Sequence, residues 1–306
     1  MNVNNSFAKK QEYPFPKLCF GCAAAFARNL ITDEEAVELI NSCLQQGINF
    51  FDTGHHYGCA EQRLGVALKN ISREDVYIST KAGVKIENGK FVKDFSPEWI
   101  KESLDISLRR MGIDYVDILY LYFPRKEHLT AELFLTLNEL KEQGKVRYIG
   151  INTFTPELLE YIAKEKLFDV VMLDYNIVRQ DREPVIKALY EQGITVIAGQ
   201  ALAEGLFSKD FFHIRSRKDL WYLLRTFGRK SSQVLYKEAK RFRFLNKVDG
   251  FDASQIALKY VLDNPHISSA CFGTVSLEHL KKNIESQNIV IPEELKRRIR
   301  EAAKGK

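Results

Sequence analysis

The chain alternates short apolar runs of strand length with amphipathic segments of helical length, and this alternation limits the folds open to it. INFFDT at 48–53 and VRYIGIN at 146–152 are two of the apolar runs, rich in the β-branched and aromatic residues typical of strands. Helix signals stand between such runs: Thr32 with Glu35 forms a capping box, which predicts a helix start. Eight runs predict strands, at 17–25, 48–53, 76–83, 115–123, 146–152, 169–176, 194–202 and 268–273.

Eight strand–helix units in regular succession predict an α/β fold, a single-domain (β/α)8 TIM barrel spanning residues 1–306, rather than an open sheet. One segment, 203–252, interrupts the rhythm after the seventh strand. We interpret it as a long substrate-side insertion that carries helices. It contains the cations Arg215, Arg217, Lys218, Arg225, Arg229 and Lys230. These would suit an anionic small-molecule substrate, although a solvated helical surface is the simpler interpretation.

Composition narrows the range of partners. The 306 residues are 45% hydrophobic and 28% charged, with a net charge of +5, so the chain is globular and nucleic acid is not a required partner. No apolar stretch approaches the ~18 residues of a membrane span, and the N-terminus lacks the apolar core of a secretion signal. We therefore expect a cytoplasmic protein with no membrane partner; the oligomeric state is unknown from sequence. Five cysteines, including Cys19 and Cys22, are expected to be reduced and mostly buried.

The active site of such a barrel lies at the carboxyl ends of its strands. Asp52 ends the second strand and Lys81 ends the third, so an ion pair between these neighbours is expected. Tyr57 follows shortly after Asp52, and a nearby ammonium would lower the pKa of its phenol, which would make Tyr57 a proton donor. A purely structural ion pair with Tyr57 as a rim aromatic fits the same residues, so both interpretations stay open. His56 could line the site, but no metal is expected because a third ligand at suitable spacing is missing.

Several passages carry a family resemblance. NFFDTGHHYGCAEQRLGVAL at 49–68 resembles the signature of the aldo-keto reductases, in which Asp-Thr ends the second strand and Tyr-Gly follows. VYISTKAG, LRRMGIDYVDILYLYFP and GKVRYIGIN resemble the family's third, fourth and fifth strand passages. GLFS at 205–208 and FGTVSLEHLKKN at 272–283 resemble its cofactor-binding region. The resemblance extends from about Lys17 to the last helix.

The resemblance implies hydride transfer from a nicotinamide, usually NADPH, to a carbonyl. It implies that Tyr57 delivers the proton, that Lys81 lowers the pKa of Tyr57, and that Asp52 holds Lys81. The phosphates and adenosine would lie on the loop after the seventh strand and on the start of the eighth helix, where backbone N–H groups suit phosphate. The implied cofactor-binding residues are Gly21, Asp52, Asn152, Met172, Gly199, Gln200, Leu202, Gly205, Gly273, Thr274, Val275, Ser276, His279 and Asn283.

The chain departs from the family pattern at several places. Tyr122 stands where the family has its fourth catalytic residue, a His, and such a replacement can redirect reduction toward a C=C bond. Met172 replaces a Gln, and Gly199 replaces a residue that stacks on the nicotinamide. His279 replaces an Arg used for the 2′-phosphate, so NADP is preferred with NAD possible.

The leading hypothesis is an NAD(P)-dependent oxidoreductase that acts on a carbonyl or a conjugated C=C, with Tyr57 as proton donor and Tyr122 shaping the substrate site. Two alternatives stay open. One is a non-redox lyase, dehydratase or epimerase that uses Tyr57 and Lys81. The other is a non-catalytic, cofactor-sensing binding partner.

Overall fold

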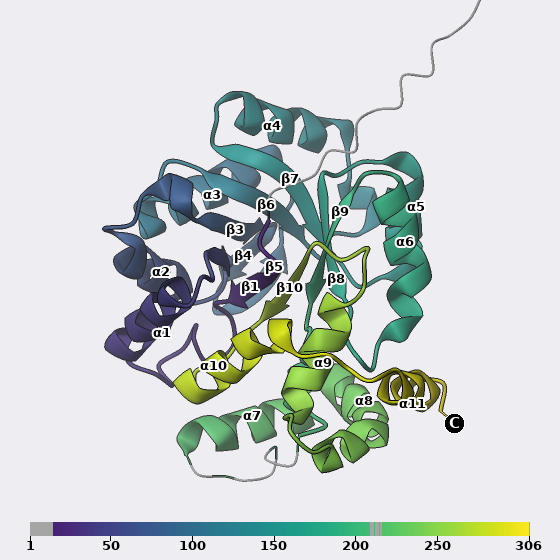
Figure 1. The fold of residues 1–306 in the computed structure, drawn as a ribbon. Coiled ribbons are helices and arrows are strands. Elements are labelled where there is room, and N and C mark those ends of the chain that lie inside the picture. Colours follow the sequence, from purple (N-terminus) through teal and green to yellow (C-terminus); the bar gives the residue numbers. More distant parts are fainter. Residues whose placement is uncertain (1–14, 209–210, 212–213, 215, 306) are drawn as a thin grey trace, which may run out of the picture.

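The computed structural model describes residues 15–208, 211, 214 and 216–305. Eight parallel strands close into a barrel in the order β1-β10-β9-β8-β7-β6-β3-β2, with helices packed around them (Figure 1). The predicted (β/α)8 fold is therefore confirmed. The barrel strands are β1 Leu18–Gly21, β2 Phe50–Asp52, β3 Tyr77–Ala82, β6 Val116–Tyr122, β7 Val146–Asn152, β8 Val170–Asp174, β9 Thr195–Gly199 and β10 Ser269–Phe272.

The helices follow the predicted start signals. The capping box is present, because Oγ1 of Thr32 accepts from the amide of Glu35 while the Glu35 carboxylate accepts from the amide of Thr32. Ser96 likewise caps its helix through the amide of Trp99. Around the barrel lie α1 Asp33–Gln45, α2 Ala60–Leu68, α3 Pro97–Met111, α4 Ala131–Glu142, α5 Pro156–Glu165, α6 Glu183–Glu191, α9 Ala253–Leu262, α10 Leu277–Glu285 and α11 Glu293–Ala303.

The barrel is filled by its own side chains. The interior cluster comprises Phe15, Cys19, Phe50, Ile118, Tyr120, Val170, Met172 and Ile197, and a larger apolar cluster separates the strands from the surrounding helices. The inside of the barrel is therefore a packed core, and chemistry has to take place at its mouth.

The barrel closes between its first and last strands. Leu18 in β1 pairs with Ala270 in β10, and Nζ of Lys17 donates to the carbonyl of Ile267 over 3.2 Å. At the carboxyl ends of the two strands the backbones approach so closely that a Cβ on Gly273 would lie 2.9 Å from the carbonyl oxygen of Gly21. Only glycine fits at position 273 without a shift of the backbone.

A β-hairpin after β3 lies outside the predicted elements. It consists of β4 Val84–Glu87 and β5 Lys90–Lys93, paired antiparallel to each other and separate from the barrel. Asn88 and Gly89 form the turn, and both have positive φ (50° and 74°), as a two-residue Asn-Gly turn requires. The hairpin extends the loop that follows β3, at the end of the barrel where Lys81 lies.

The 203–252 segment does carry helices. These are α7 Arg217–Gly228, α8 Lys230–Ala239 and the 3-10 helices η4 Ala203–Gly205 and η6 Lys240–Lys247. In Figure 1, α7 and α8 lie at the bottom of the view, outside the ring formed by α1 to α6. Arg215 and the side chain of Lys218 lie outside the described part of the chain. None of the described helices is long and apolar enough to cross a membrane.

Candidate active site

Asp52 and Lys81 form a buried ion pair, as the sequence predicts. Nζ of Lys81 donates to Oδ2 of Asp52 over 2.5 Å and to the carbonyl of Thr53 over 2.7 Å, and the two side chains are only 1% and 5% exposed. The hydroxyl of Ser79 donates to the other carboxylate oxygen over 2.7 Å. Burial lowers the pKa of Lys81, but Asp52 and Tyr57 raise that pKa by more, so it lies above the usual lysine value. The ammonium is therefore permanently charged and fixed in position.

Tyr57 lies against this ammonium. Nζ of Lys81 is 4.8 Å from the centroid of the Tyr57 ring, and the ring faces Gly54, where an added Cβ would lie 3.4 Å away. The expectation of a lowered pKa is wrong for the free protein. Burial raises the pKa of Tyr57 well above the usual tyrosine value, and the opposing charge of Lys81 only partly offsets that effect. Tyr57 is thus held in its protonated form, which is the state that a proton donor needs.

Tyr122 lies beside Tyr57, with ring centroids 6.5 Å apart in an edge-to-face arrangement. Burial raises the pKa of Tyr122, while Lys81, a hydrogen bond with Tyr57 and the charge of Arg229 lower it by less. The two phenols and the ammonium of Lys81 therefore form one cluster at the ends of β2, β3 and β6. The structure thus brings together three residues that the sequence places at or just after strand ends.

The hairpin adds a cation that sequence reasoning missed. Nζ of Lys93 donates to the carbonyl of Tyr122 over 2.5 Å and lies 4.6 Å from the centroid of the Tyr122 ring. Burial lowers the pKa of Lys93 to about 8. The Asn-Gly pair between alternating apolar residues was the available sequence signal, because it marks a hairpin that returns the chain toward the strand end.

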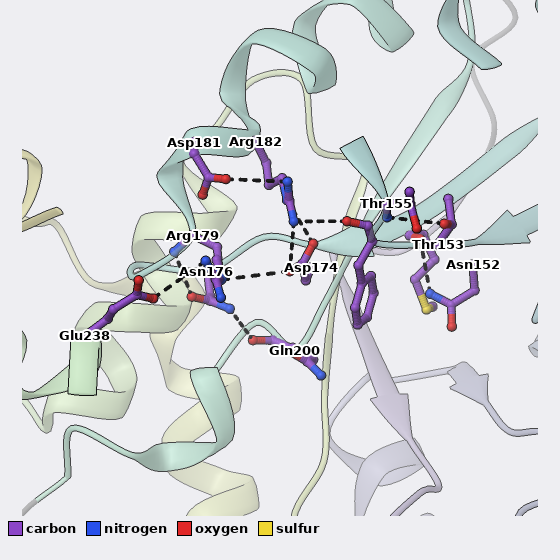
Figure 2. Close-up of polar contacts among 12 residues, drawn as sticks. Asn152, Thr153, Thr155, Asp174, Asn176, Arg179, Asp181, Arg182, Gln200 and Glu238 are labelled. Atoms are coloured by element: carbon purple, nitrogen blue, oxygen red, sulfur yellow. Dashed lines mark hydrogen bonds and ion pairs between the residues drawn. The ribbon is translucent and has the colours of Figure 1, made fainter. Parts of the chain in front are cut away.

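The predicted cofactor residues on β7, β8 and β9 lie side by side at the strand ends. Nδ2 of Asn152 donates to the carbonyl of Met172 over 3.1 Å (Figure 2). A Cβ on Gly199 would lie 3.2 Å from Cγ of Met172, so the Met172 side chain lies against Gly199. Met172 and Gly199, which both depart from the family pattern, are thus in contact with each other.

An ion-pair network that was not predicted supports the same strand ends (Figure 2). Arg182 donates to both carboxylate oxygens of Asp174, over 2.9 and 3.3 Å, and to the carbonyl of Phe154 over 3.1 Å. Arg179 joins Asp174 to Glu238 of α8, at 4.0 and 3.6 Å. The network therefore connects β8 to the insertion. A strand-end Asp and two arginines shortly after it were the only sequence signal.

The loop after β9 is held in a strained backbone conformation. Gln200, Ala203 and Glu204 all have positive φ (53°, 46° and 57°), although none is a glycine. Nδ2 of Asn176 donates a hydrogen bond to the carbonyl of Gln200 over 3.1 Å. Leu202 packs on the apolar core, and Gly205, at the end of the loop, also has a positive φ. Residues in this backbone region cluster at functional sites, so the strain agrees with the predicted cofactor role of the loop.

The last predicted group lies at the start of α10. Ser276 caps the helix by accepting from the amide of His279 over 3.3 Å, and Oγ1 of Thr274 accepts from the amide of Ser276 over 3.1 Å. Val275 packs on the apolar core, and Gly21 lies across the barrel seam from Gly273.

These residues fit a dinucleotide. Oδ1 of Asn283 is buried and has no hydrogen-bond partner among the described residues, so it is free to accept from the amino group of an adenine. His279 is exposed on the first turn of the helix. Lys282 is engaged by Asp252 at 2.9 Å and by Glu278 at 2.8 Å.

One cation of the 203–252 segment, Arg229, influences Tyr122. The charge of Arg229 acts on Tyr122 and the phenol of Tyr122 acts on Arg229. Arg225 lies 5.6 Å and Arg28 lies 5.5 Å from the ring of Trp221. Burial and the charge of Arg225 lower the pKa of Arg229. Arg225 in turn lies 3.8 Å from the carboxylate of Glu204.

The described residues contain no group of three or more His, Cys, Asp or Glu side chains arranged to hold a metal ion. Their five cysteines, two of them partly exposed, are all free thiols. His55 is buried against Trp99 of α3, with ring centroids 5.5 Å apart, whereas His56 is directed toward Tyr57 and Tyr122.

Comparison with known proteins gives one consistent result. The sequence model of the Aldo/keto reductase family matches residues 17–304. An L-galactose dehydrogenase of Arabidopsis thaliana is 29% identical over 266 residues, covering 83% of this chain and 78% of that protein. An NADH-specific methylglyoxal reductase of Escherichia coli (strain K12) is 29% identical over 265 residues, covering 79% of both. The holo form of the aldo-keto reductase AKR11C1 from Bacillus halodurans has a TM-score of 0.76 at 26% identity and covers 94% of this chain and 91% of that one.

Proposed function

Because this chain belongs to the aldo/keto reductase family, it is an NAD(P)-dependent oxidoreductase, and we propose that it reduces the carbonyl of a small molecule with Tyr57 as proton donor. The observation that carries this proposal is the position of the Lys81 ammonium, 2.5 Å from Asp52 and 4.8 Å from the ring of Tyr57. A fixed positive charge beside a protonated phenol is the arrangement that general acid catalysis by tyrosine needs.

Each residue of the cluster has a definite task. When bound, the nicotinamide supplies the hydride. The hydroxyl of Tyr57 gives its proton to the substrate oxygen as negative charge develops there. The ammonium of Lys81 then stabilises the phenolate that remains, and Asp52 keeps the ammonium in place. Because burial raises the pKa of Tyr57, the proton is present on the enzyme over the whole physiological pH range.

A conjugated C=C bond is the second substrate class, and Tyr122 is the residue that favours it. A hydrogen bond with Tyr57 lowers the pKa of Tyr122, so Tyr122 acts as its acceptor and the two phenols are coupled. Product analysis with an enone separates the two outcomes, since carbonyl reduction gives an allylic alcohol and C=C reduction gives a saturated ketone.

We also propose that the substrate is anionic. Lys93 from the hairpin and Arg229 from the insertion approach Tyr122 from two different elements, and Arg28 and Arg225 lie nearby around Trp221. Two separate loops that both place cations beside the reacting residues favour a substrate with a carboxylate or phosphate group. The alternative, a solvated basic surface, predicts no discrimination between charged and neutral substrates.

For the cofactor, we propose a modest preference for NADPH, with NADH also accepted. His279 is exposed at the start of α10, but Lys282 is engaged by two carboxylates, which leaves little free positive charge for a 2′-phosphate. The Escherichia coli relative is named as NADH-specific, which agrees with only a small preference of this chain for NADPH over NADH.

The test is an assay of nicotinamide absorbance with NADPH and NADH against a panel of aldehydes, ketones and enones, with Tyr57→Phe as the matched control. Turnover by the wild type and its loss in the variant would support the proposal. Equal activity in both would exclude Tyr57 as the proton donor. The non-redox and cofactor-sensing hypotheses are not favoured by the family, and the cytoplasmic location stays a prediction.

A further inference from the structure

His56 is an imidazole placed between the two phenols of the site. Its ring centroid lies 4.7 Å from that of Tyr57 and 4.3 Å from that of Tyr122. Phe91 of the hairpin packs on the ring from a third direction, at 5.8 Å and an interplanar angle of 78°. The orientation of the imidazole is therefore determined by three aromatic neighbours from three different segments of the chain.

Both ring nitrogens of His56 lack a partner. Nδ1 and Nε2 are each inaccessible to solvent, and within the described residues neither makes a hydrogen bond. The neighbouring His55 also has an unpaired Nδ1, but its ring faces α3 and makes a hydrogen bond to the backbone of Ser103, so only His56 lacks a partner at both nitrogens. A buried polar group without a partner is unfavourable, and an apolar ring at position 56 would satisfy the same packing. The unpaired nitrogens therefore indicate a partner supplied by a ligand.

The surroundings keep this imidazole neutral. Burial, then the charges of Lys81 on β3 and Lys93 on β5, and then His55, lower the pKa of His56 to about 3. The groups that face it from β2, β3, the hairpin and β6 are thus two ammonium ions, a second histidine and two protonated phenols. A neutral imidazole has one N–H donor and one acceptor. At neutral pH, the uncharged ring of His56 can therefore donate one hydrogen bond through its single N–H.

We propose that His56 donates a hydrogen bond to the carbonyl oxygen of the substrate and shares that oxygen with the hydroxyl of Tyr57. The inference rests on the proposed carbonyl reduction. A carbonyl oxygen has two lone pairs and accepts two donors. Tyr57 is one donor, and we assign the second to His56, because its imidazole lies beside both phenols and its ring nitrogens have no partner among the described residues. A fixed donor directed at an oxygen that gains negative charge stabilises the transition state more than the ground state.

The experiment compares three substitutions at this position. His56→Phe keeps the aromatic contacts and removes the donor, His56→Gln keeps a donor, and His56→Leu is a second apolar variant in case the phenylalanine does not fold. The matched control is His266→Phe, in which the same chemical change is made at a ring that packs on Tyr190 (4.8 Å), in the segment before β10 at the opposite end of the barrel. Thermal melting establishes that each variant is folded.

We expect His56→Phe and His56→Leu to lower kcat by roughly 10²- to 10³-fold, with an unchanged Kd for NADPH by fluorescence titration. His56→Gln recovers part of that loss, and His266→Phe keeps wild-type kcat. A folded His56→Phe or His56→Leu variant with wild-type kcat would overturn the inference and leave His56 as a packing residue. If instead the wild type itself gives no turnover with any carbonyl, the proposed function fails, which is a separate result.

Discussion

Lys81 and Asp52 are joined by an ion pair of 2.5 Å in which neither side chain has appreciable contact with solvent. The pair comes from neighbouring strands, β3 and β2, whose register places Asp52 opposite Ser79. It therefore links the stability of the barrel to the chemistry at its mouth, because the same ammonium that neutralises Asp52 faces Tyr57.

The first prediction concerns stability. Asp52→Ala leaves the buried ammonium of Lys81 without its carboxylate, and we expect the free energy of unfolding to fall by about 3–5 kcal/mol. Urea denaturation followed by circular dichroism measures this change. The control is Glu139→Ala, which breaks the exposed pair with Lys101 and should change stability by no more than about 1 kcal/mol. A loss at Asp52 as small as that of the control would contradict a structural contribution from the pair.

The pH dependence of this contribution has a definite sign. The pKa of Lys81 is raised in the folded protein, so the folded state binds the proton more tightly than the unfolded state does. The stabilisation is fully present below the unfolded lysine pKa, about 10.4, and is lost only as pH rises through the higher folded value. The contribution of the pair to the stability of the wild type should therefore be constant across the neutral range.

The second prediction concerns Tyr57. Tyr57→Phe removes the proton donor but keeps the ring on Gly54, and we expect kcat to fall by roughly 10²–10⁴-fold. The dissociation constant for NADPH should stay within about twofold of the wild-type value, since the hydroxyl acts only in the chemical step. Steady-state assays and fluorescence titration measure the two quantities. A variant that loses cofactor affinity instead of kcat would place Tyr57 in binding rather than in catalysis.

The third prediction concerns substrate charge. Arg229→Met should lower kcat/KM for a carboxylate-bearing aldehyde by about tenfold or more, the value of one charge-assisted hydrogen bond. A neutral aldehyde of the same shape should be little affected. Lys230→Met is the control, because Lys230 is the next residue in the chain, is exposed like Arg229, and has no described influence on Tyr122. Equal effects of the two variants would favour the solvated basic surface.

The fourth prediction concerns Lys93. Burial lowers its pKa to about 8, so its ammonium is lost at a lower pH than that of an ordinary lysine. Preference for the anionic over the neutral aldehyde should decline as pH rises through about 8. Lys93→Met should reduce the preference at low pH and abolish this step in the profile. A wild-type preference that is the same on both sides of the transition would exclude Lys93 from substrate binding.

The fifth prediction concerns the cofactor. His279→Arg supplies a planar, permanently charged group at the start of α10, and we expect the ratio of kcat/KM for NADPH over NADH to rise by about tenfold. Arg298→His, on α11 where Arg298 lies 4.6 Å from the ring of Phe244, is the control for a change of charge elsewhere on the surface. An unchanged ratio in His279→Arg would move the 2′-phosphate site away from this turn.

Sequence periodicity was sufficient for the barrel and for the grouping of Asp52, Tyr57 and Lys81. Strand ends in a (β/α)8 fold meet at one mouth, so residues that are distant in sequence could be placed together without coordinates. The same logic did not extend to the hairpin, since its two strands are short and mostly exposed. The pairing of Asn88 with Gly89 is a local signal that competes poorly with the stronger barrel pattern around it.

The electrostatic state of Tyr57 could not be predicted either. The sequence predicts an ammonium beside the phenol, and Lys81 does lie beside Tyr57. The lowered pKa inferred from that neighbour is wrong, because burial raises the pKa of Tyr57 by more than Lys81 lowers it. Burial of one side chain depends on how loops from several strands pack over it. Likewise, the network of Arg182 and Asp174 depends on the path of the chain after β8, which periodicity does not specify.

The seam between β1 and β10 has a consequence for synthesis. The contact between Lys17 and Ile267 joins residues 250 positions apart, so β1 leaves the ribosome long before its partner exists. Until β10 emerges, β1 and β9 each present an open edge, and such edges promote association with other chains. A nascent chain that stops before Ser269 cannot close the barrel. The emergence of β10 therefore determines when the newly made protein loses these open edges and becomes less prone to aggregation.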